Sequence, residues 1–374
     1  MKGKNEKELA LLAKAGADFA SKILAPNREE SDNFPFGPLF TDAIAQAFDL
    51  GFFHAALPED MEGFGERLSP LCSLLENIAK DDASLAAIIL SNAFAQNLLL
   101  EAGETELLKG IAAGAENYAG ILIGSQVFCD PSETPPALSA KKDGNDWLLN
   151  GKSPYVVLGG LAKRVLVPAL VEKKELAFFL AEVEPAGISV SEPVFSLGVH
   201  ACPAYDLEFK NAKARFLGQP GKAGEIFASV AGRMHLAAAS VLSGIMKGSV
   251  KEALDYAKKR FQGGKPIIRW SEMQMILGGM AQKSRIAEMA VTEACRLFDS
   301  GDARKRSACL AAFLHCAESA IEVTTDGIQA LGGVGYMKDF GQEKRFRDAQ
   351  HLTAVFGILP KKKLRYLQKA MLGE

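Results

Sequence analysis

The spacing of apolar residues along the chain changes twice and so divides it into three stretches. Near the start, Leu9, Leu12 and Phe19 recur at helical intervals, and residues 6–118 as a whole favour helices. Residues 83–100 are apolar on nearly every side of a helix, which is typical of a helix buried in a core. We therefore expect an N-terminal helical domain over residues 1–118.

A different pattern begins after this stretch and continues to residue 223. Short β-branched and aromatic runs are separated there by Gly, Pro, Asn and Asp, which predicts an all-β unit of the sandwich or barrel type. The runs occupy residues 120–128, 146–149, 164–170, 177–183, 204–209 and 214–217. The Asn150-Gly151 pair predicts a tight turn between two of them. The middle β domain is expected to span residues 119–223.

Helical periodicity returns in the last part of the chain. Four amphipathic segments with short connections predict an antiparallel four-helix bundle over residues 224–374. These segments occupy residues 227–261, 271–300, 302–331 and about 361–371. The whole chain is thus predicted to be α+β and mostly α.

Composition and charge argue against several classes of function. A net charge of −2 gives no electrostatic reason to bind nucleic acid, and no stretch approaches 18 apolar residues without a charge, so we expect no membrane span. The six cysteines form no C-x-x-C pair, which argues against a metal site or a redox dithiol. The charged, amphipathic start lacks a signal-type apolar core, so the cytoplasm is the expected location. The longest basic run, residues 361–363, is expected at a helix start or in solvent.

Residues 325–360 carry the most informative motif of the chain. A helical segment ends there at Gly332-Gly333-x-Gly335 and is followed by Arg347-Asp348-Ala349. Up to Thr353 this stretch resembles the C-terminal signature of the acyl-CoA dehydrogenases, flavoproteins that desaturate acyl-CoA thioesters. The order helical, β, helical bundle is similar to that family along nearly the whole chain. The resemblance implies FAD as cofactor, an acyl-CoA as substrate and an electron-transfer flavoprotein as electron acceptor.

Two motifs resemble residues with which this family reaches the FAD of a neighbouring subunit. Arg260 starts a segment similar to the family's Arg-x-x-Phe-Gly-Lys, whose arginine binds the pyrophosphate, and a guanidinium suits phosphate oxygens. Gln329, Gly332 and Gly333 would contact the ADP part of the same cofactor. Each pattern alone also fits an ordinary helix end, with a glycine cap or a glycine terminator. Their joint occurrence favours the cofactor site.

The residues expected around the chain's own flavin ring depart from the family pattern. Ser125 is the only residue near its position that could replace the family's threonine, and Tyr155 could still stack on a ring. Val157 stands where the family has a hydroxyl side chain that hydrogen-bonds the flavin N5 atom. A valine cannot donate that hydrogen bond.

The usual catalytic carboxylate is also missing. Where the family has Tyr-Glu-Gly-Thr, this chain has Val-Phe-Gly-Ile, with Phe356 at the position of the base. Some relatives carry the base instead just before a substrate-side arginine, and the corresponding pair here is Gly232-Arg233. Neither Phe356 nor Gly232 can remove a proton, so no catalytic residue is predicted, and Arg233 is the one substrate residue.

Four other polar residues have weaker claims to a role at the site. Asp348 is expected to pair with Arg345 or Arg347, and His235 to be structural on an apolar helix. His351 lies upstream of Phe356, and Glu133 lies in a loop that could reach a pocket mouth.

Three functions remain in competition. The chain could be a homomeric acyl-CoA dehydrogenase with a relocated base, or a non-catalytic acyl-CoA-binding or scaffold remnant. It could also be one subunit of a hetero-tetramer that desaturates fatty or organic acyl-CoA, in which a second family member supplies the base. The loss of the inward-facing residues with retention of Arg260, Gln329, Gly332 and Gly333 favours the subunit of a hetero-oligomer.

Overall fold

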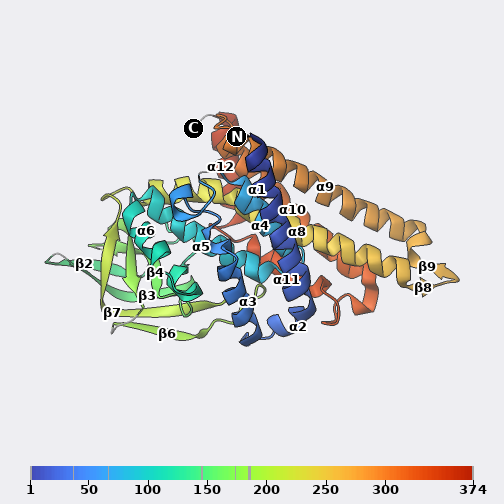
Figure 1. Ribbon diagram of the computed structural model, residues 1–374, viewed down its shortest axis with the longest axis horizontal. Helices are drawn as coiled ribbons and strands as arrows, with labels where there is room; N and C mark the ends of the chain where they lie inside the picture. The colour runs from blue at the N-terminus through green and yellow to red at the C-terminus, as the bar shows by residue number, and fades with distance from the viewer. Residues whose placement is uncertain are drawn as a thin grey trace.

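The computed structural model describes residues 2–36, 38–65, 67–144, 146–172, 174–183 and 187–372. A β-sheet unit lies at one side of the molecule and a long helical bundle extends from the other, with the N-terminal helices between them (Figure 1). The N-terminal helices are α1 (Lys2–Phe19), α2 (Arg28–Ser31), α3 (Pro38–Asp49), α4 (Ser69–Ala79), α5 (Ala83–Glu101), α6 (Thr105–Ala113) and α7 (Tyr118–Ile121). The predicted helical, β, helical order is confirmed.

Helix α5 is the buried core helix that the sequence predicts. It starts at Asp82, whose carboxylate accepts hydrogen bonds from the backbone N–H groups of Ser84 (2.7 Å) and Leu85 (3.4 Å). Nearly all of its side chains are buried. By length and composition alone α5 and α8 (Ala223–Lys259) could each cross a membrane, but 94% and 78% of their apolar windows are buried within the protein. Their apolarity is therefore used in packing against the rest of the chain.

The middle part is a seven-stranded barrel. Its strands are β1 (Ile123–Ser125), β2 (Ser139–Asp143), β3 (Asp146–Val157), β4 (Arg164–Val171), β5 (Glu175–Glu182), β6 (Ile188–Pro193) and β7 (Ala204–Leu217). The order β1-β3-β2-β4-β5-β7-β6, with the further pairings β1–β4 and β3–β7, closes the sheet on itself. Apolar side chains such as Val167, Phe179 and Phe209 fill its interior. Of the two architectures predicted, the barrel is the one observed.

The predicted turn at Asn150-Gly151 is wrong. Both residues lie inside the continuous strand β3, at a register shift opposite β7. The side chain of Asn150 instead holds a bulge, since it exchanges two 3.0 Å hydrogen bonds with Asn211, which has a φ of 50°. Gly151 is needed because a Cβ there would lie 2.7 Å from the carbonyl oxygen of Ala137. The same residue pair that favours a hairpin turn also suits a bulge.

The C-terminal bundle contains three long helices, α8 (Ala223–Lys259), α9 (Ser271–Asp299) and α10 (Lys305–Leu331), and the short fourth helix α12 (Leu359–Leu367). Helices α8 and α10 run parallel. Their first turns line one cleft, and further along both helices the hydroxyl of Ser249 in α8 donates to the carbonyl of Val323 in α10. A small hairpin, β8 (Phe261–Gln262) and β9 (Lys265–Pro266), caps the far end of α8. Helix α11 (Gln342–Leu352) was not predicted from the sequence.

Buried ion pairs join α11 to the other parts of the chain. Lys344 lies 2.6 Å from Asp348 and 3.4 Å from Asp82, and all three side chains are almost completely buried. The other carboxylate oxygen of Asp348 accepts the N–H of Val199 at 2.6 Å. Burial alone would lower the pKa of Lys344, but Asp348 and Asp82 outweigh it and raise that pKa. Asp348 thus pairs with Lys344, and not with Arg345 or Arg347 as predicted.

Replacing Lys344 by methionine is expected to lower the free energy of unfolding by about 3–5 kcal/mol, because Asp82 and Asp348 would remain buried without a counter-charge. Urea denaturation of the purified chain measures this change. Lys251→Met is the matched control, since Lys251 forms an exposed i,i+4 pair with Asp255 at 3.7 Å and should cost less than about 0.5 kcal/mol. Equal effects of the two substitutions would contradict the importance of the buried network.

Candidate functional site

A cleft of about 1120 Å³ opens between the first turns of α8 and α10, helix α12 and the loop that follows β1. Its walls mix apolar side chains such as Ile226, Phe227 and Leu310 with charged ones at the rim. Gly232 lies in this cleft, and a Cβ added to it would meet no atom within 4 Å. The second location of the family's base therefore faces open space in this chain.

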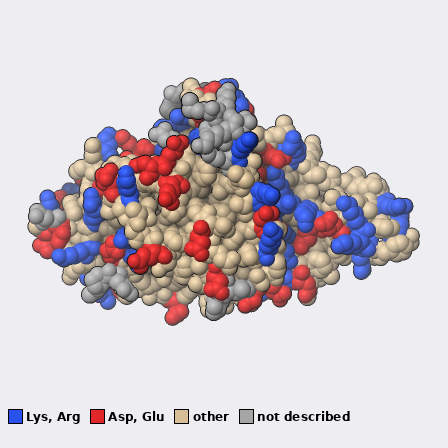
Figure 2. Space-filling model, viewed as in Figure 1, with Lys and Arg blue, Asp and Glu red and all other residues tan. Residues whose placement is uncertain are grey.

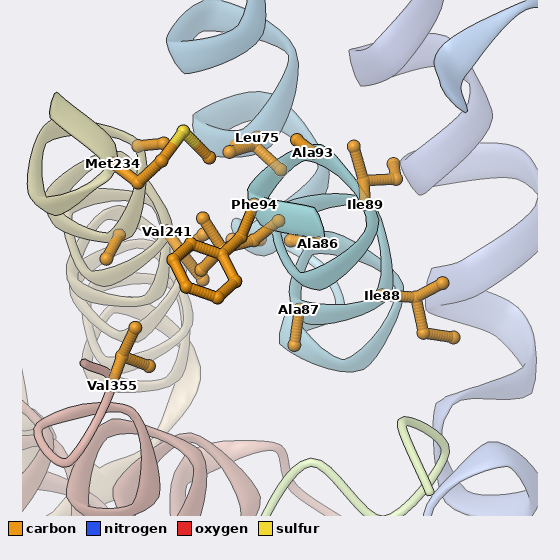
Figure 3. Packing of buried hydrophobic residues seen from close by; sticks show 14 of the residues in the cluster. Leu75, Ala86, Ala87, Ile88, Ile89, Ala93, Phe94, Met234, Val241 and Val355 are labelled. Atoms are coloured by element: carbon orange, nitrogen blue, oxygen red, sulfur yellow. The ribbon is translucent and has the colours of Figure 1, made fainter. Parts of the chain in front are cut away.

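Phe356 packs behind His235, which lines this cleft. It is fully buried, and its ring lies 4.8 Å from the ring of Phe94 and 5.4 Å from that of His235. Figure 3 shows Phe94 projecting from α5 toward Met234 of α8 and the C-terminal segment that carries Val355. The position of the usual base is thus part of an aromatic core.

The backbone at this position is held tightly. The N–H of Phe356 donates to the carbonyl of Val127 at 2.8 Å, and Phe356 and Gly357 have φ values of 59° and 104°. A φ of 104° is strained for any residue with a side chain, so a glycine is favoured next to the phenylalanine, and a Cβ there would also lie 2.9 Å from a carboxylate oxygen of Glu133.

Lys362 supports the same turn from behind. The basic run 361–363 lies in the first turns of α12, one of the two places expected for it, but Lys362 itself is not in solvent. Its side chain is fully buried, and its Nζ donates to the carbonyls of Gly357 (2.6 Å) and Thr353 (3.2 Å). Burial lowers the pKa of Lys362 to about 7, although Glu133 opposes the shift. One sequence signal could have found it: Lys362 follows the half-buried Leu359 by three residues, on the same face of α12.

The carboxylates nearest to this turn are engaged in ion pairs. Asp130 and Glu133 lie 2.6 Å and 3.1 Å from the guanidinium of Arg365, and Glu133 also accepts the N–H of Ile358 at 3.3 Å. Both side chains are almost fully shielded from solvent. They brace the loop after β1 against α12, which gives Glu133 a structural task.

The structure brings the predicted flavin-ring residues together. Ser125 of β1 pairs directly with Val157 of β3, and the hydroxyl of Ser125 is buried with no hydrogen-bond partner among the residues that the structure describes. The hydroxyl of Tyr155 lies 3.1 Å from Nε2 of His351, and the ring of Phe128 lies 4.6 Å from that imidazole. Burial raises the pKa of Tyr155 to about 12 and lowers the pKa of His351 to about 4, so both are neutral near pH 7.

The residues predicted to reach a neighbour lie at the opposite end of the bundle. Arg260 follows the last residue of α8, and Gln329, Gly332 and Gly333 lie at the end of the parallel helix α10. All four are exposed. Large apolar side chains are exposed in the same segments: Phe261, Trp270, Val334, Tyr336 and Met337. On the face shown in Figure 2, Lys and Arg side chains are concentrated over the bundle and its hairpin end.

Arg233 is held by α5. Its guanidinium donates to Glu101 (2.7 Å) and to the side chain of Asn97 (2.9 Å), and Arg233 itself is not among the residues that line the cleft. Glu101 does line the cleft. The predicted role of Arg233 toward a substrate stays a prediction.

Comparisons with known proteins now agree with this architecture. Residues 6–113 match the model of the acyl-CoA dehydrogenase N-terminal domain, and residues 229–358 match that of the acyl-CoA dehydrogenase C-terminal domain. The chain belongs to the acyl-CoA dehydrogenase family. It is 28% identical to the 3-(aryl)acrylate reductase of Clostridium sporogenes over 93% of this chain and 94% of that protein.

Two further proteins of known identity are similar to this chain. The caffeyl-CoA reductase-Etf complex subunit CarC of Acetobacterium woodii is 25% identical over 93% of this chain and 94% of its own length. The solved butyryl-CoA dehydrogenase of Megasphaera elsdenii superposes with a TM-score of 0.86 at 22% identity, over 97% of this chain and 98% of that one. The second likeness shows the shared fold.

FAD is the cofactor of this family, and the two groups of residues fit it unequally. The exposed guanidinium of Arg260 and the exposed glycines after α10 suit a dinucleotide that approaches from outside. The inner group does not fit an isoalloxazine ring. The cavity beside Ser125 measures only about 10 Å³, Val157 offers no donor, and the Phe356–Val127 hydrogen bond joins the two segments directly.

The low pKa of Lys362 predicts a pH dependence of stability. Because its folded pKa (about 7) lies below the unfolded value of 10.5, the unfolded chain binds more protons between these pH values. The contribution of Lys362 to the free energy of unfolding should therefore rise with pH across that window, by up to about 1.4 kcal/mol per pH unit. Lys362→Met should remove this slope in urea denaturation at about pH 6.5 and about pH 9.5.

Lys361→Met provides the control for this experiment. Lys361 is the exposed neighbour of Lys362, so its replacement should leave the pH profile unchanged. Parallel profiles of the wild-type chain and Lys362→Met would show that Lys362 keeps an ordinary pKa.

Proposed function

We propose that this chain is one subunit of a hetero-oligomeric, FAD-dependent acyl-CoA dehydrogenase. A second member of the family supplies the flavin-ring pocket and the carboxylate that removes the α-proton of the acyl-CoA thioester. This chain contributes Arg260 and the end of α10 to the FAD of that partner. The reaction of the assembly is α,β-desaturation of the thioester.

One observation carries the proposal: the outward residues of the cofactor site match the family pattern, whereas the inner residues do not. Arg260, Gln329 and Gly332 remain exposed at one end of the bundle. The inner half is filled by the protein's own side chains, with Phe356 packed on Phe94. A homomeric enzyme with a relocated base would need space for the flavin ring in its own subunit, and these side chains occupy that space. A scaffold remnant would have no reason to keep only the outward residues.

The exposed apolar residues support an interface at the same place. Met275 and Met289 on α9 are 70% and 58% exposed, and Phe261 of the hairpin is 63% exposed. An apolar face next to unpaired phosphate-binding groups is typical of an obligate subunit interface. A hetero-tetramer built on this face would bring Arg260 to the partner's FAD.

Other partners follow from the same proposal. A relative of this chain is named as a subunit of a reductase–Etf complex. An electron-transfer flavoprotein would accordingly reoxidise the FAD of the assembly. All six cysteines are free, which suits the reducing cytoplasm as its location.

Expressed alone, the chain should purify without stoichiometric flavin and without acyl-CoA oxidation, because its own ring site is closed. Co-expressed with a family member that has the usual glutamate, it should co-purify as a complex with one FAD per pair. Flavin absorbance per protein, with the subunit ratio from mass spectrometry, measures both states. A yellow, active homomer would refute the proposal.

Arg260→Ala should weaken FAD retention by the co-expressed pair by at least about ten-fold, since a charge-assisted contact to phosphate is lost. Flavin retained after dialysis, measured at several FAD concentrations, gives this factor. Lys259→Ala is the control, because it removes the same charge from the neighbouring exposed residue. Similar losses in both variants would mean that general charge, and not the position of Arg260, matters.

A further inference from the structure

Helix α12, at the edge of the molecule next to the C-terminus, presents its leucines to solvent (Figure 1). Leu364 and Leu367 are 59% and 49% exposed, and Leu372 in the turn that follows is 59% exposed. We call these three residues the leucine stripe. Lys362 lies two positions before Leu364, hence on the opposite side of the helix, and is completely buried. A helix at the surface of a globular protein normally has the reverse arrangement, with its apolar side toward the core.

Polar contacts hold α12 in this orientation. The guanidinium of Arg365 lies 2.6 Å from Asp130 and 3.1 Å from Glu133 in the loop after β1. The two hydrogen bonds that buried Lys362 donates to backbone carbonyls fix the same side of the helix. Turning the leucines inward would break these contacts and leave buried carboxylates without a counter-charge. The outward direction of the leucine stripe is therefore a fixed property of the fold.

Two ion pairs of α10 connect the leucine stripe to the apolar residues exposed on α9. Glu318 of α10 pairs with Lys363 of α12. Glu322, one helical turn further along α10, lies 2.7 Å from Lys283 of α9. Ile286 follows Lys283 by three residues, on the same side of α9, and is 44% exposed. The exposed sides of α9, α10 and α12 are thus parts of one surface, which continues into the α9 face that the proposed function assigns to the partner.

The charges around the leucine stripe indicate what can cover it. Lys361 and Lys369 are exposed beside it, and residues 358–372 contain no acidic residue. Two copies of α12 paired across a two-fold axis would bring these lysines together, which like charges disfavour. An anionic lipid surface would attract the lysines but repel Glu318 and Glu322, which are 51% and 59% exposed on the same surface. A protein whose apolar face is bordered by carboxylates matches α12 better than either.

We infer that the leucine stripe packs against the second family member of the hetero-oligomer, on an apolar face whose carboxylates lie opposite Lys361 and Lys369. The existence of this partner rests on the proposed function. The inference extends the interface from the hairpin end of the bundle along α9 to α12. Arg365, Tyr366 and Lys369 also line the cleft, so a partner docked on the outer side of α12 holds one wall of the cleft in place.

Hydrogen exchange tests where the partner docks. The backbone amides of residues 361–367 should exchange at least about ten-fold more slowly in the co-purified pair than in the chain alone, because a covered short helix opens less often. Mass spectrometry of peptides from both samples, each at the same pH and temperature, gives this ratio.

Leu364→Ser tests the contact itself. It should weaken association of the pair at least about ten-fold, measured as dissociation on dilution in the analytical ultracentrifuge. The chain alone should keep its fold, because Leu364 is already exposed in it. Leu50→Ser is the matched control, since Leu50 is 53% exposed just after α3 and should not affect association. Lys361→Glu should also weaken the pair, whereas Lys152→Glu on the exposed side of β3 should not.

The outcomes separate this inference from the proposed function. A pair with one FAD in which α12 exchanges as fast as in the chain alone, or in which Leu364→Ser acts no more strongly than Leu50→Ser, would refute only the inference. Self-association of the chain alone, or its binding to phosphatidylglycerol vesicles, would also refute it if Leu364→Ser abolished that binding. Failure of any family member to co-purify would refute both.

Discussion

The arrangement of this molecule depends on the burial of Lys344. A lysine loses its hydration when it is buried, and only paired carboxylates with further hydrogen bonds compensate for that loss. Here Asp82 caps α5 with one oxygen and faces Lys344 with the other, while Asp348 also accepts the N–H of Val199. One ammonium group thereby joins the N-terminal helices, the segment before β7 and the bundle. Helix α11 is docked further by Arg345, which lies 2.6 Å from Glu252, and by Arg347, which lies 2.6 Å from Asp32.

The position of α11 in turn determines the end of the candidate site. The helix ends at Leu352, and four residues later Phe356 adopts a left-handed backbone that Lys362 stabilises through two carbonyls. A side chain at this position must point into the space between α5 and α8. A glutamate would place a carboxylate there, whereas the phenylalanine extends the aromatic core. In this chain the turn positions an aromatic side chain in the core.

Much of the fold could be predicted from local patterns, and the failures have physical causes. The apolar α5 and the long helices of the bundle follow from periodicity, because their burial is one-sided or complete over many residues. Helix α11 was missed because its buried residues include Lys344, Arg345 and Asp348, which satisfy one another only in three dimensions. The Asn150-Gly151 pair was misjudged because a bulge and a turn need the same backbone freedom.

The residues of the candidate site that belong to a sequence motif could be predicted. The residues whose role depends on packing against distant segments could not. Arg260 and Gly332 were found from their sequence context, and the structure places them at one exposed end of the bundle. The closed state of the inner site could not be read from Ser125 or Val157 alone, since it depends on the contacts of Phe128 and Phe356 with other segments.

The length of α8 separates the two groups of residues that the site analysis distinguishes. Helix α8 has 37 residues, so its two ends are about 55 Å apart. His235 and the cleft lie toward its first turns, and Arg260 lies beyond its last. Side chains that far apart share no neighbours, and substitutions at one end have energetic effects independent of the other. The packing around Phe356 and the exposed residues around Arg260 are therefore energetically independent parts of one bundle.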